Sequence, residues 1–193
     1  MVSTVVEICN MALARLGDSR ISDIDADEEK ARLCKLFYTQ TRDEVLREHP
    51  WTFATGRAIL AAISGTNLTG FDYRYQLPVD CLYVRNQIDA EGETYTDITS
   101  NYKIEGREIH SDLSPCAIKY TKKIDDPAQF DSQFVEALAL KLASKLAVKL
   151  SGKQQLEAGM IQQYLIVLQN AKGLDGDESQ QQHVPETFWS EYN

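Results

Sequence analysis

The sequence has few of the patterns that mark catalytic or metal sites. Its four cysteines form no C-x-x-C pair; they are Cys9, Cys34, Cys81 and Cys116. We therefore expect no zinc site, and the apolar helical patterns around Cys9 and Cys34 favour buried thiols over disulfides. The three histidines stand far apart, and no acidic run has the complete spacing of a calcium loop. We predict no catalytic, cofactor-binding or metal-binding residues.

Positive charge is also scarce. The 193 residues include 20 lysines and arginines against 29 aspartates and glutamates, which gives a net charge of −9 and a pI near 4.8. Because phosphate binding depends on clustered basic residues, this balance argues against a broad basic face that grips nucleic acid, although such a protein can lie beside DNA. The first residues lack the positive region and the long apolar core of a signal peptide, so we expect synthesis inside the cell.

An apolar stretch, Phe130 to Leu150, dominates the second half of the chain. It is apolar on almost every side, so a helix here must pack on several faces at once. Either Asp126-Pro127 or Asp131 is expected to start this helix, because a carboxylate accepts hydrogen bonds from the free N–H groups and proline fits the first turn. Gly152 is expected to end it. We predict that this stretch forms a central helix.

Two helices are expected before it. Thr4 and Glu7 have the spacing of a capping box at the start of the first helix, and Gly17 closes that helix. The second helix follows an acidic stretch, 25–29, and must end before Pro50, because the residue preceding a proline disfavours helical backbone angles.

Between Trp51 and Ile124 the pattern changes to glycine, proline, asparagine and short aromatic or β-branched runs, which predicts strands. The candidate strands are Thr52 to Ala62, Tyr73 to Leu77, Cys81 to Ile88, Tyr102 to Glu105, Glu108 to His110 and Ala117 to Lys122. Gly106 is expected to form the turn of a hairpin. Trp51 is expected to seal the boundary between the helices and the strands.

The order of these elements predicts an α+β fold. A four-helix bundle carries a β-rich insertion between its second and third helices, and an extended C-terminal tail follows the fourth. The boundaries are 1–50 and 126–173 for the two halves of the bundle, 51–125 for the insertion and 174–193 for the tail. The fourth helix spans Leu156 to Ala171, with Gly159 expected to permit close helix contact and Gly173 expected to end it.

Two features of the chain favour binding to other molecules. Three lysines recur every four residues and share one line along the central helix: Lys141, Lys145 and Lys149. This lysine stripe either faces a channel or an acidic neighbour, or forms a solvated edge. The tail has five acidic residues and no lysine or arginine, and it ends in Phe188, Trp189 and Tyr192. We expect these aromatic side chains to dock in a groove of a partner.

Four segments carry a resemblance to a known family. They are Ile8 to Gly17 (ICNMALARLG), His49 to Ala54 (HPWTFA), Tyr75 to Leu82 (YQLPVDCL) and Phe134 to Ala147. Their order and spacing, together with the chain length, resemble the tail tubular protein A family, the head-to-tail adaptors of short-tailed bacteriophages. The resemblance spans nearly the whole chain.

The resemblance implies a structural virion protein with no enzymatic activity and no cofactor. Such a protein forms a homo-oligomeric, dodecameric ring between the portal protein and the tail nozzle, which is of the tail tubular protein B type. Double-stranded DNA passes through the ring without sequence-specific binding, and the ring helps to retain the packaged DNA. The implied location is the head–tail junction of the virion, after synthesis in the host bacterial cytoplasm and with no membrane partner.

An alternative function from another class is that of a tail-associated hydrolase of peptidoglycan or capsule glycan. It needs two carboxylates roughly 5 to 10 Å apart across a cleft, one of them with a raised pKa. The 29 acidic residues allow such a pair, but no motif singles one out. Facing carboxylates in the β-rich part would favour the enzyme.

Overall fold

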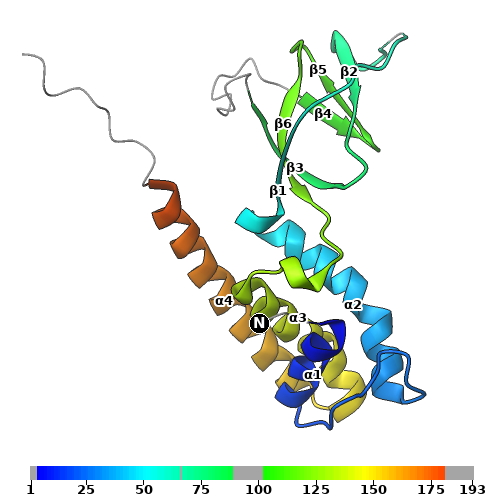
Figure 1. The fold of residues 1–193 in the computed structure, drawn as a ribbon, viewed down its shortest axis with the longest axis vertical. Helices are drawn as coiled ribbons and strands as arrows, with labels where there is room; N and C mark the ends of the chain where they lie inside the picture. The colour runs from blue at the N-terminus through cyan, green and yellow to red at the C-terminus, as the bar shows by residue number, and fades with distance from the viewer. Residues whose placement is uncertain (1–3, 66, 89–101, 181–193) are drawn as a thin grey trace, which may run out of the picture.

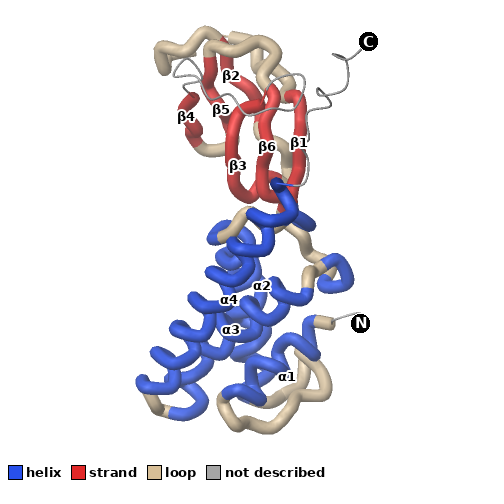
Figure 2. The backbone as a smooth tube through the Cα atoms, turned by 90° about the vertical axis from the view of Figure 1, so that its left-hand side faces the viewer, coloured by secondary structure: helices blue, strands red, loops and turns tan. Residues whose placement is uncertain are grey.

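A computed structural model describes residues 4–65, 67–88 and 102–180, without the side chains of 173–180. In this part the chain forms four α-helices, two short 3-10 helices and two three-stranded sheets, which confirms the α+β class. The helices gather at one end of an elongated molecule and the sheets at the other (Figure 1). Figure 2 shows the sheets stacked on the end of the helical part.

Helix α1 (Val5–Arg15) begins as its sequence predicts. The Thr4 hydroxyl accepts a hydrogen bond from the Glu7 N–H at 3.2 Å, and the Glu7 carboxylate accepts one from the Thr4 N–H at 2.8 Å. Both halves of the capping box are therefore present. Gly17, with φ of 74°, takes the left-handed conformation just after the helix, so its predicted role as a helix stop is confirmed.

Helix α2 (Glu29–Glu48) follows the acidic stretch and ends two residues before Pro50, as predicted. Its Cys34 and the Cys9 of α1 are both buried free thiols, as predicted. The guanidinium of Arg42, almost fully buried, lies 2.7 Å from the carboxylates of both Asp43 and Asp125. This double pairing fastens α2 to the segment that leads from the sheets into the next helix.

Helix α3 (Ser132–Ser151) is the central helix. Asp131 caps it by accepting a hydrogen bond from the Gln133 N–H at 2.7 Å, whereas Asp126 caps the preceding short helix η2 (Pro127–Gln129). The predicted stop at Gly152 is confirmed by its φ of 68°. Helices α1, α2 and α4 all contact α3, so the predicted packing on several faces is confirmed.

Helix α4 (Gln154–Gln180) corrects two predictions. It continues through Gly173, because a helical glycine costs only about 1 kcal/mol relative to alanine and does not by itself end a helix. Gly159 does not mark a close helix contact either, since a Cβ built there meets nothing within 4 Å.

The six strands form two antiparallel sheets. The first has the order β1 (Thr55–Ile59), β6 (Ala117–Lys122) and β3 (Cys81–Ile88). The second has the order β2 (Tyr73–Gln76), β5 (Glu108–Ser111) and β4 (Tyr102–Glu105). Gly106, with φ of 59°, forms the β4–β5 turn as predicted.

The single strand predicted from Thr52 to Ala62 is wrong at both ends. Its first three residues form a turn of 3-10 helix, η1 (Thr52–Ala54), in which the Ala54 N–H donates to the Trp51 carbonyl at 3.2 Å. After Ile59 the chain leaves the first sheet, and Ala62 pairs with Tyr75 of the second. The crossing from one sheet to the other ends β1 early.

The molecule has two separate apolar cores. One lies among the helices and includes Trp51, and the other lies between the two sheets. Trp51 is 3% exposed, and its indole N–H donates to the Val45 carbonyl of α2 at 2.9 Å. Its own carbonyl accepts a hydrogen bond from Arg85 of β3 at 3.0 Å. The prediction that Trp51 seals the boundary between helices and strands is therefore confirmed.

Candidate functional site

The lysine stripe lies where α3 meets α2. The Lys141 ammonium is 3.1 Å from a carboxylate oxygen of Glu48, and the Lys145 ammonium is 2.6 Å from one of Glu44. All four side chains are partly buried. Two of the three lysines are thus neutralised by α2 of the same chain. Lys149 is exposed and forms no ion pair within the described residues.

Tyr164 of α4 joins the ion pairs Lys141–Glu48 and Lys145–Glu44. We call this set of contacts between α2, α3 and α4 the polar seam. The Tyr164 hydroxyl donates a hydrogen bond to Glu48, and the Lys141 ammonium lies 4.6 Å from the centre of its ring. Burial raises the pKa of Tyr164 above its ordinary value, and the hydrogen bond to the Glu48 carboxylate raises it further. Tyr164 therefore stays a donor at all physiological pH values, and the seam holds α2, α3 and α4 together. A role of the stripe in a channel or an interface stays a prediction.

Replacing Tyr164 by phenylalanine is expected to lower the free energy of unfolding by about 1.5–3 kcal/mol, the range for hydrogen bonds to charged groups. The ring stays in place, so the loss isolates the hydroxyl. Urea denaturation followed by circular dichroism measures it. The exposed Tyr73 provides the matched control, since Tyr73→Phe should change the midpoint little. Equal effects of the two substitutions would contradict the seam.

The outer side of α4 carries aliphatic side chains in solvent. Ile161 is 39% exposed, Leu165 is 56% exposed and Ile166 is 58% exposed. We call these three residues the α4 ridge. Tyr164 and Leu168 of the same helix are buried, so its core-facing side is already filled. A helix with apolar side chains both inside and outside is typical of a contact surface.

The sequence pattern did not predict the α4 ridge. The apolar face predicted for this helix has the spacing of Met160, Tyr164 and Leu168, and the structure confirms that these are buried. The signal that could have found the ridge is the unbroken apolar run 164–168. A helix with a single apolar face has room for only part of such a run on that face.

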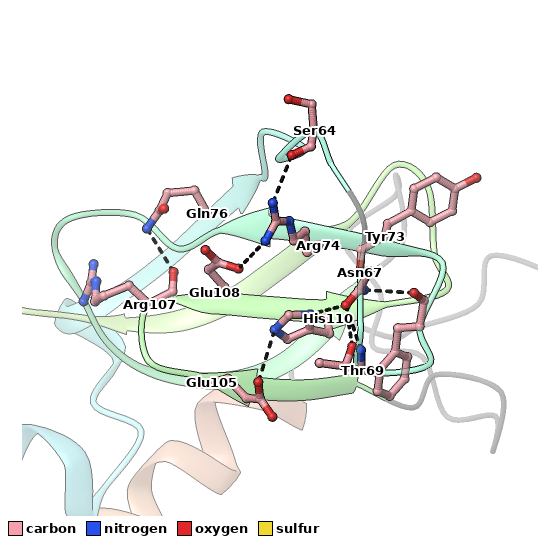
Figure 3. A network of polar contacts seen from close by, with 11 residues as sticks. Ser64, Asn67, Thr69, Tyr73, Arg74, Gln76, Glu105, Arg107, Glu108 and His110 are labelled. Carbon is pink, nitrogen blue, oxygen red and sulfur yellow. Dashed lines mark hydrogen bonds and ion pairs between the residues drawn. The ribbon is translucent and has the colours of Figure 1, made fainter.

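The second sheet presents a face made of polar side chains (Figure 3). The register places Arg74, His110 and Lys103 in one row across its three strands. In Figure 3 the buried His110 lies between Asn67 and Glu105, with Nδ1 3.2 Å from the side-chain amide oxygen (Oδ1) of Asn67 and Nε2 3.9 Å from the Glu105 carboxylate. These contacts fasten the loop that contains Asn67 to the sheet.

The carboxylates of this face do not have the properties of a hydrolase pair. The Lys103 ammonium, by hydrogen bonding, lowers the pKa of Glu105, whereas a general acid needs a raised pKa. Glu108 lies 3.8 Å from the Arg74 guanidinium. In the part of the chain that the structure describes, no group of three or more histidine, cysteine or acidic side chains could hold a metal ion.

Comparisons with known proteins leave the function open. No protein-family model matches this chain, and a search of curated proteins gives no significant match. None of the helices in the described ranges is long and apolar enough to cross a membrane. Three of the residues predicted to bind a partner, Phe188, Trp189 and Tyr192, lie outside the described residues.

Proposed function

We propose that this protein is a head-to-tail adaptor of a short-tailed bacteriophage. In this proposal it is a structural component without enzymatic activity. Copies form a dodecameric ring between the portal protein and the tail nozzle, and double-stranded DNA passes through the ring. The proposal joins the family resemblance of four segments to one observation of the structure, the α4 ridge.

The ridge supports assembly because it offers apolar area that the monomer leaves in water. Burying apolar surface contributes about 25 cal/mol per Å², so covering several half-exposed aliphatic side chains favours association. A contact between the ridge and a different surface of the next copy repeats until the ring closes, provided that the rotation fits. The central helix α3 is contacted by α1, α2 and α4 of its own chain, whereas α4 also keeps three aliphatic side chains in solvent.

The finer architecture proposed here is a four-helix bundle with a β-rich insertion. Three helices contact α3, and the chain passes from α2 into the sheets at Trp51 and returns at Asp126. The core between the sheets is built from residues of the range 58–120, which supports an insertion spanning 51–125, and Trp51 and Ala54 join this insertion to the helical core. The aromatic residues of the tail would then dock on the portal or on a neighbouring copy.

The test of assembly is the mass of the purified chain, alone and with its portal protein. Mass photometry should detect a closed ring in at least one of these samples. The double variant Leu165→Gln, Ile166→Gln should weaken ring formation by tenfold or more, because it places polar groups in a desolvated contact. Circular dichroism should show the same folding stability, since both side chains are exposed in the monomer.

Leu68 supplies the matched control for this test. It is 93% exposed and lies in the loop before β2, so Leu68→Gln removes an exposed leucine far from the helices. Ring formation should be unchanged in this variant. A wild-type chain that stays monomeric and has no affinity for the portal would overturn the adaptor proposal. Among the described residues no feature favours the glycan hydrolase.

A further inference from the structure

Two of the four cysteines lie together inside the helical part. Cys9 of α1 and Cys34 of α2 are both 0% exposed and belong to the core of the helices. Their side chains are hydrogen-bonded to each other, although the residues stand 25 positions apart in the chain. The other two cysteines, Cys81 and Cys116, belong to the core between the sheets. We call Cys9 and Cys34 the helical thiol pair.

A buried tyrosine lies beside the helical thiol pair. Tyr38 follows Cys34 by one turn of α2, and it is 5% exposed. Burial raises the pKa of Tyr38, and negative charge on Cys9 raises it further. The Tyr38 hydroxyl has no hydrogen-bond partner within the described residues. Cys9 of α1 therefore faces the side of α2 that carries Cys34 and Tyr38, and each thiol has the other as its reactive neighbour.

The hydrogen bond gives the two thiols different roles. It raises the pKa of Cys9, and burial raises that pKa further. The same hydrogen bond lowers the pKa of Cys34, against the opposing effects of burial and of the Asp18 charge. Because the thiolate is the nucleophile in thiol–disulfide exchange, Cys34 is the group that attacks first and Cys9 is the group that resolves the product.

A covalent bond at the helical thiol pair would change how α1 is held. Helix α1 packs on α3, and Arg15 forms an ion pair with Glu136 across that contact. Asn10 of α1 also holds the segment that leads to α2, through two hydrogen bonds with the backbone of Ile21 at 2.8 and 3.0 Å. A disulfide would join α1 to α2 directly, and it would remove conformations from the unfolded chain by closing a loop.

We propose that Cys9 and Cys34 form a reversible disulfide that fastens α1 to α2 when the protein enters an oxidising environment. The oxidant is a small disulfide of the glutathione disulfide class. The Cys34 thiolate attacks one sulfur of this oxidant, which gives a mixed disulfide and releases one small thiolate. Cys9 then loses its proton and attacks the Cys34 sulfur, which releases the second small thiolate. Two electrons pass from the cysteines to the oxidant, which leaves as two thiols.

The occasion for this change rests on the proposed adaptor function, whereas the thiol pair itself does not. A virion component is made in a reducing cytoplasm, where thiols persist, and then acts outside the cell, where disulfides persist. Because both cysteines are buried, the oxidant reaches them only when the helical part opens locally. Oxidation is therefore slow, and the disulfide is protected from reductants in the same way once it has formed.

The experiment incubates the full-length chain with glutathione disulfide and follows its mass, with one sample held near the melting temperature to promote local opening. Oxidation should lower the mass by about 2 Da, because two thiols lose their hydrogens. Digestion without a reductant should then give two peptides joined through Cys9 and Cys34. The melting temperature should rise by roughly 5–10 °C, because the cross-link constrains the unfolded chain. Dithiothreitol should reverse all of these changes.

The matched control is Cys81→Ala, Cys116→Ala, which removes the two thiols of the sheets and should oxidise as wild type does. Cys34→Ala should show neither the mass change nor the shift in melting temperature, and circular dichroism verifies that it is folded. The wild-type peptide map decides the question without any variant. Four free thiols after incubation, a disulfide between other cysteines, or a persistent glutathione adduct would overturn the proposal.

The oligomeric state of the same samples separates this inference from the proposed function. Mass photometry measures ring formation with the portal protein, before and after oxidation. A ring whose cysteines stay reduced under the oxidant would contradict the disulfide alone. A chain that forms the disulfide but never assembles would contradict the adaptor proposal and leave the redox chemistry of the helical thiol pair in place.

Discussion

Replacing Trp51 by alanine is expected to lower the free energy of unfolding by about 3–5 kcal/mol, the range for a buried tryptophan or phenylalanine. The indole ring lies 4.6 Å from His49 and 5.2 Å from Phe134, measured between ring centres, and its N–H donates to the Val45 carbonyl. Alanine would remove both ring contacts and leave that carbonyl without this donor. Because the same residue joins the helices to the sheets, the change should weaken both parts.

Thermal and urea denaturation followed by circular dichroism measure this effect. For a chain of 193 residues the melting temperature should fall by roughly 10 °C, since each kcal/mol corresponds to about 2–4 °C at this size. Trp51→Phe should lose less, because an aromatic ring is kept. The exposed Tyr73→Ala should change the stability by less than about 0.5 kcal/mol. A loss below about 1 kcal/mol in Trp51→Ala would contradict its role at the junction.

Substituting alanine at two glycines is expected to have opposite effects. Gly56 of β1 faces Tyr120 of β6, and a Cβ built on it comes within 2.6 Å of the ring carbon Cζ. That ring is 5% exposed, and its hydroxyl donates to Asp80 at 3.1 Å, so it cannot move aside freely. Gly56→Ala should therefore cost about 1–3 kcal/mol by overpacking.

Gly159→Ala is the matched substitution in α4. A Cβ there meets nothing within 4 Å, and alanine restricts the unfolded chain more than glycine does. The variant should gain about 0.5–1 kcal/mol. Urea midpoints of the two variants, measured side by side, decide the question. If Gly159→Ala destabilises the protein, this result would support the close helix contact predicted from the sequence. If Gly56→Ala leaves the stability unchanged, the Tyr120 ring can shift.

Features that depend on neighbours in the sequence were predictable. The capping box of Thr4 and Glu7, the stop at Gly152 and the turn at Gly106 all use hydrogen bonds or backbone angles within a few residues. Strands β3 and β6 have the predicted bounds, because turn residues flank runs of strand-forming residues at both ends. Here the local preference and the final fold agree.

Features that depend on distant residues were missed. The first candidate strand, Thr52 to Ala62, divides because Ala62 pairs with Tyr75 in the other sheet, which no local pattern reports. The stop predicted at Gly173 failed because glycine disfavours a helix without ending it. The first failure reflects a pairing between distant residues, and the second reflects a helix preference that was treated as a stop.

The candidate sites divide in the same way. The sequence alone placed Lys141, Lys145 and Lys149 on one line, because helical spacing is a local property. Only the tertiary structure showed that Glu44 and Glu48 neutralise two of them. The pairing of Arg57 with Lys119 was also hidden, since these residues lie 62 positions apart and become neighbours only through the register of β1 and β6.

The sequence by itself determined both ends of α1 and α3, most strand bounds, the central position of α3 and the sealing role of Trp51. These follow from short-range hydrogen bonding and from apolar periodicity, which any single segment displays. The tertiary structure decided which lysines are paired and which side of α4 remains in solvent. Those properties depend on contacts between segments that are far apart in the chain, and such segments come together only when the chain folds.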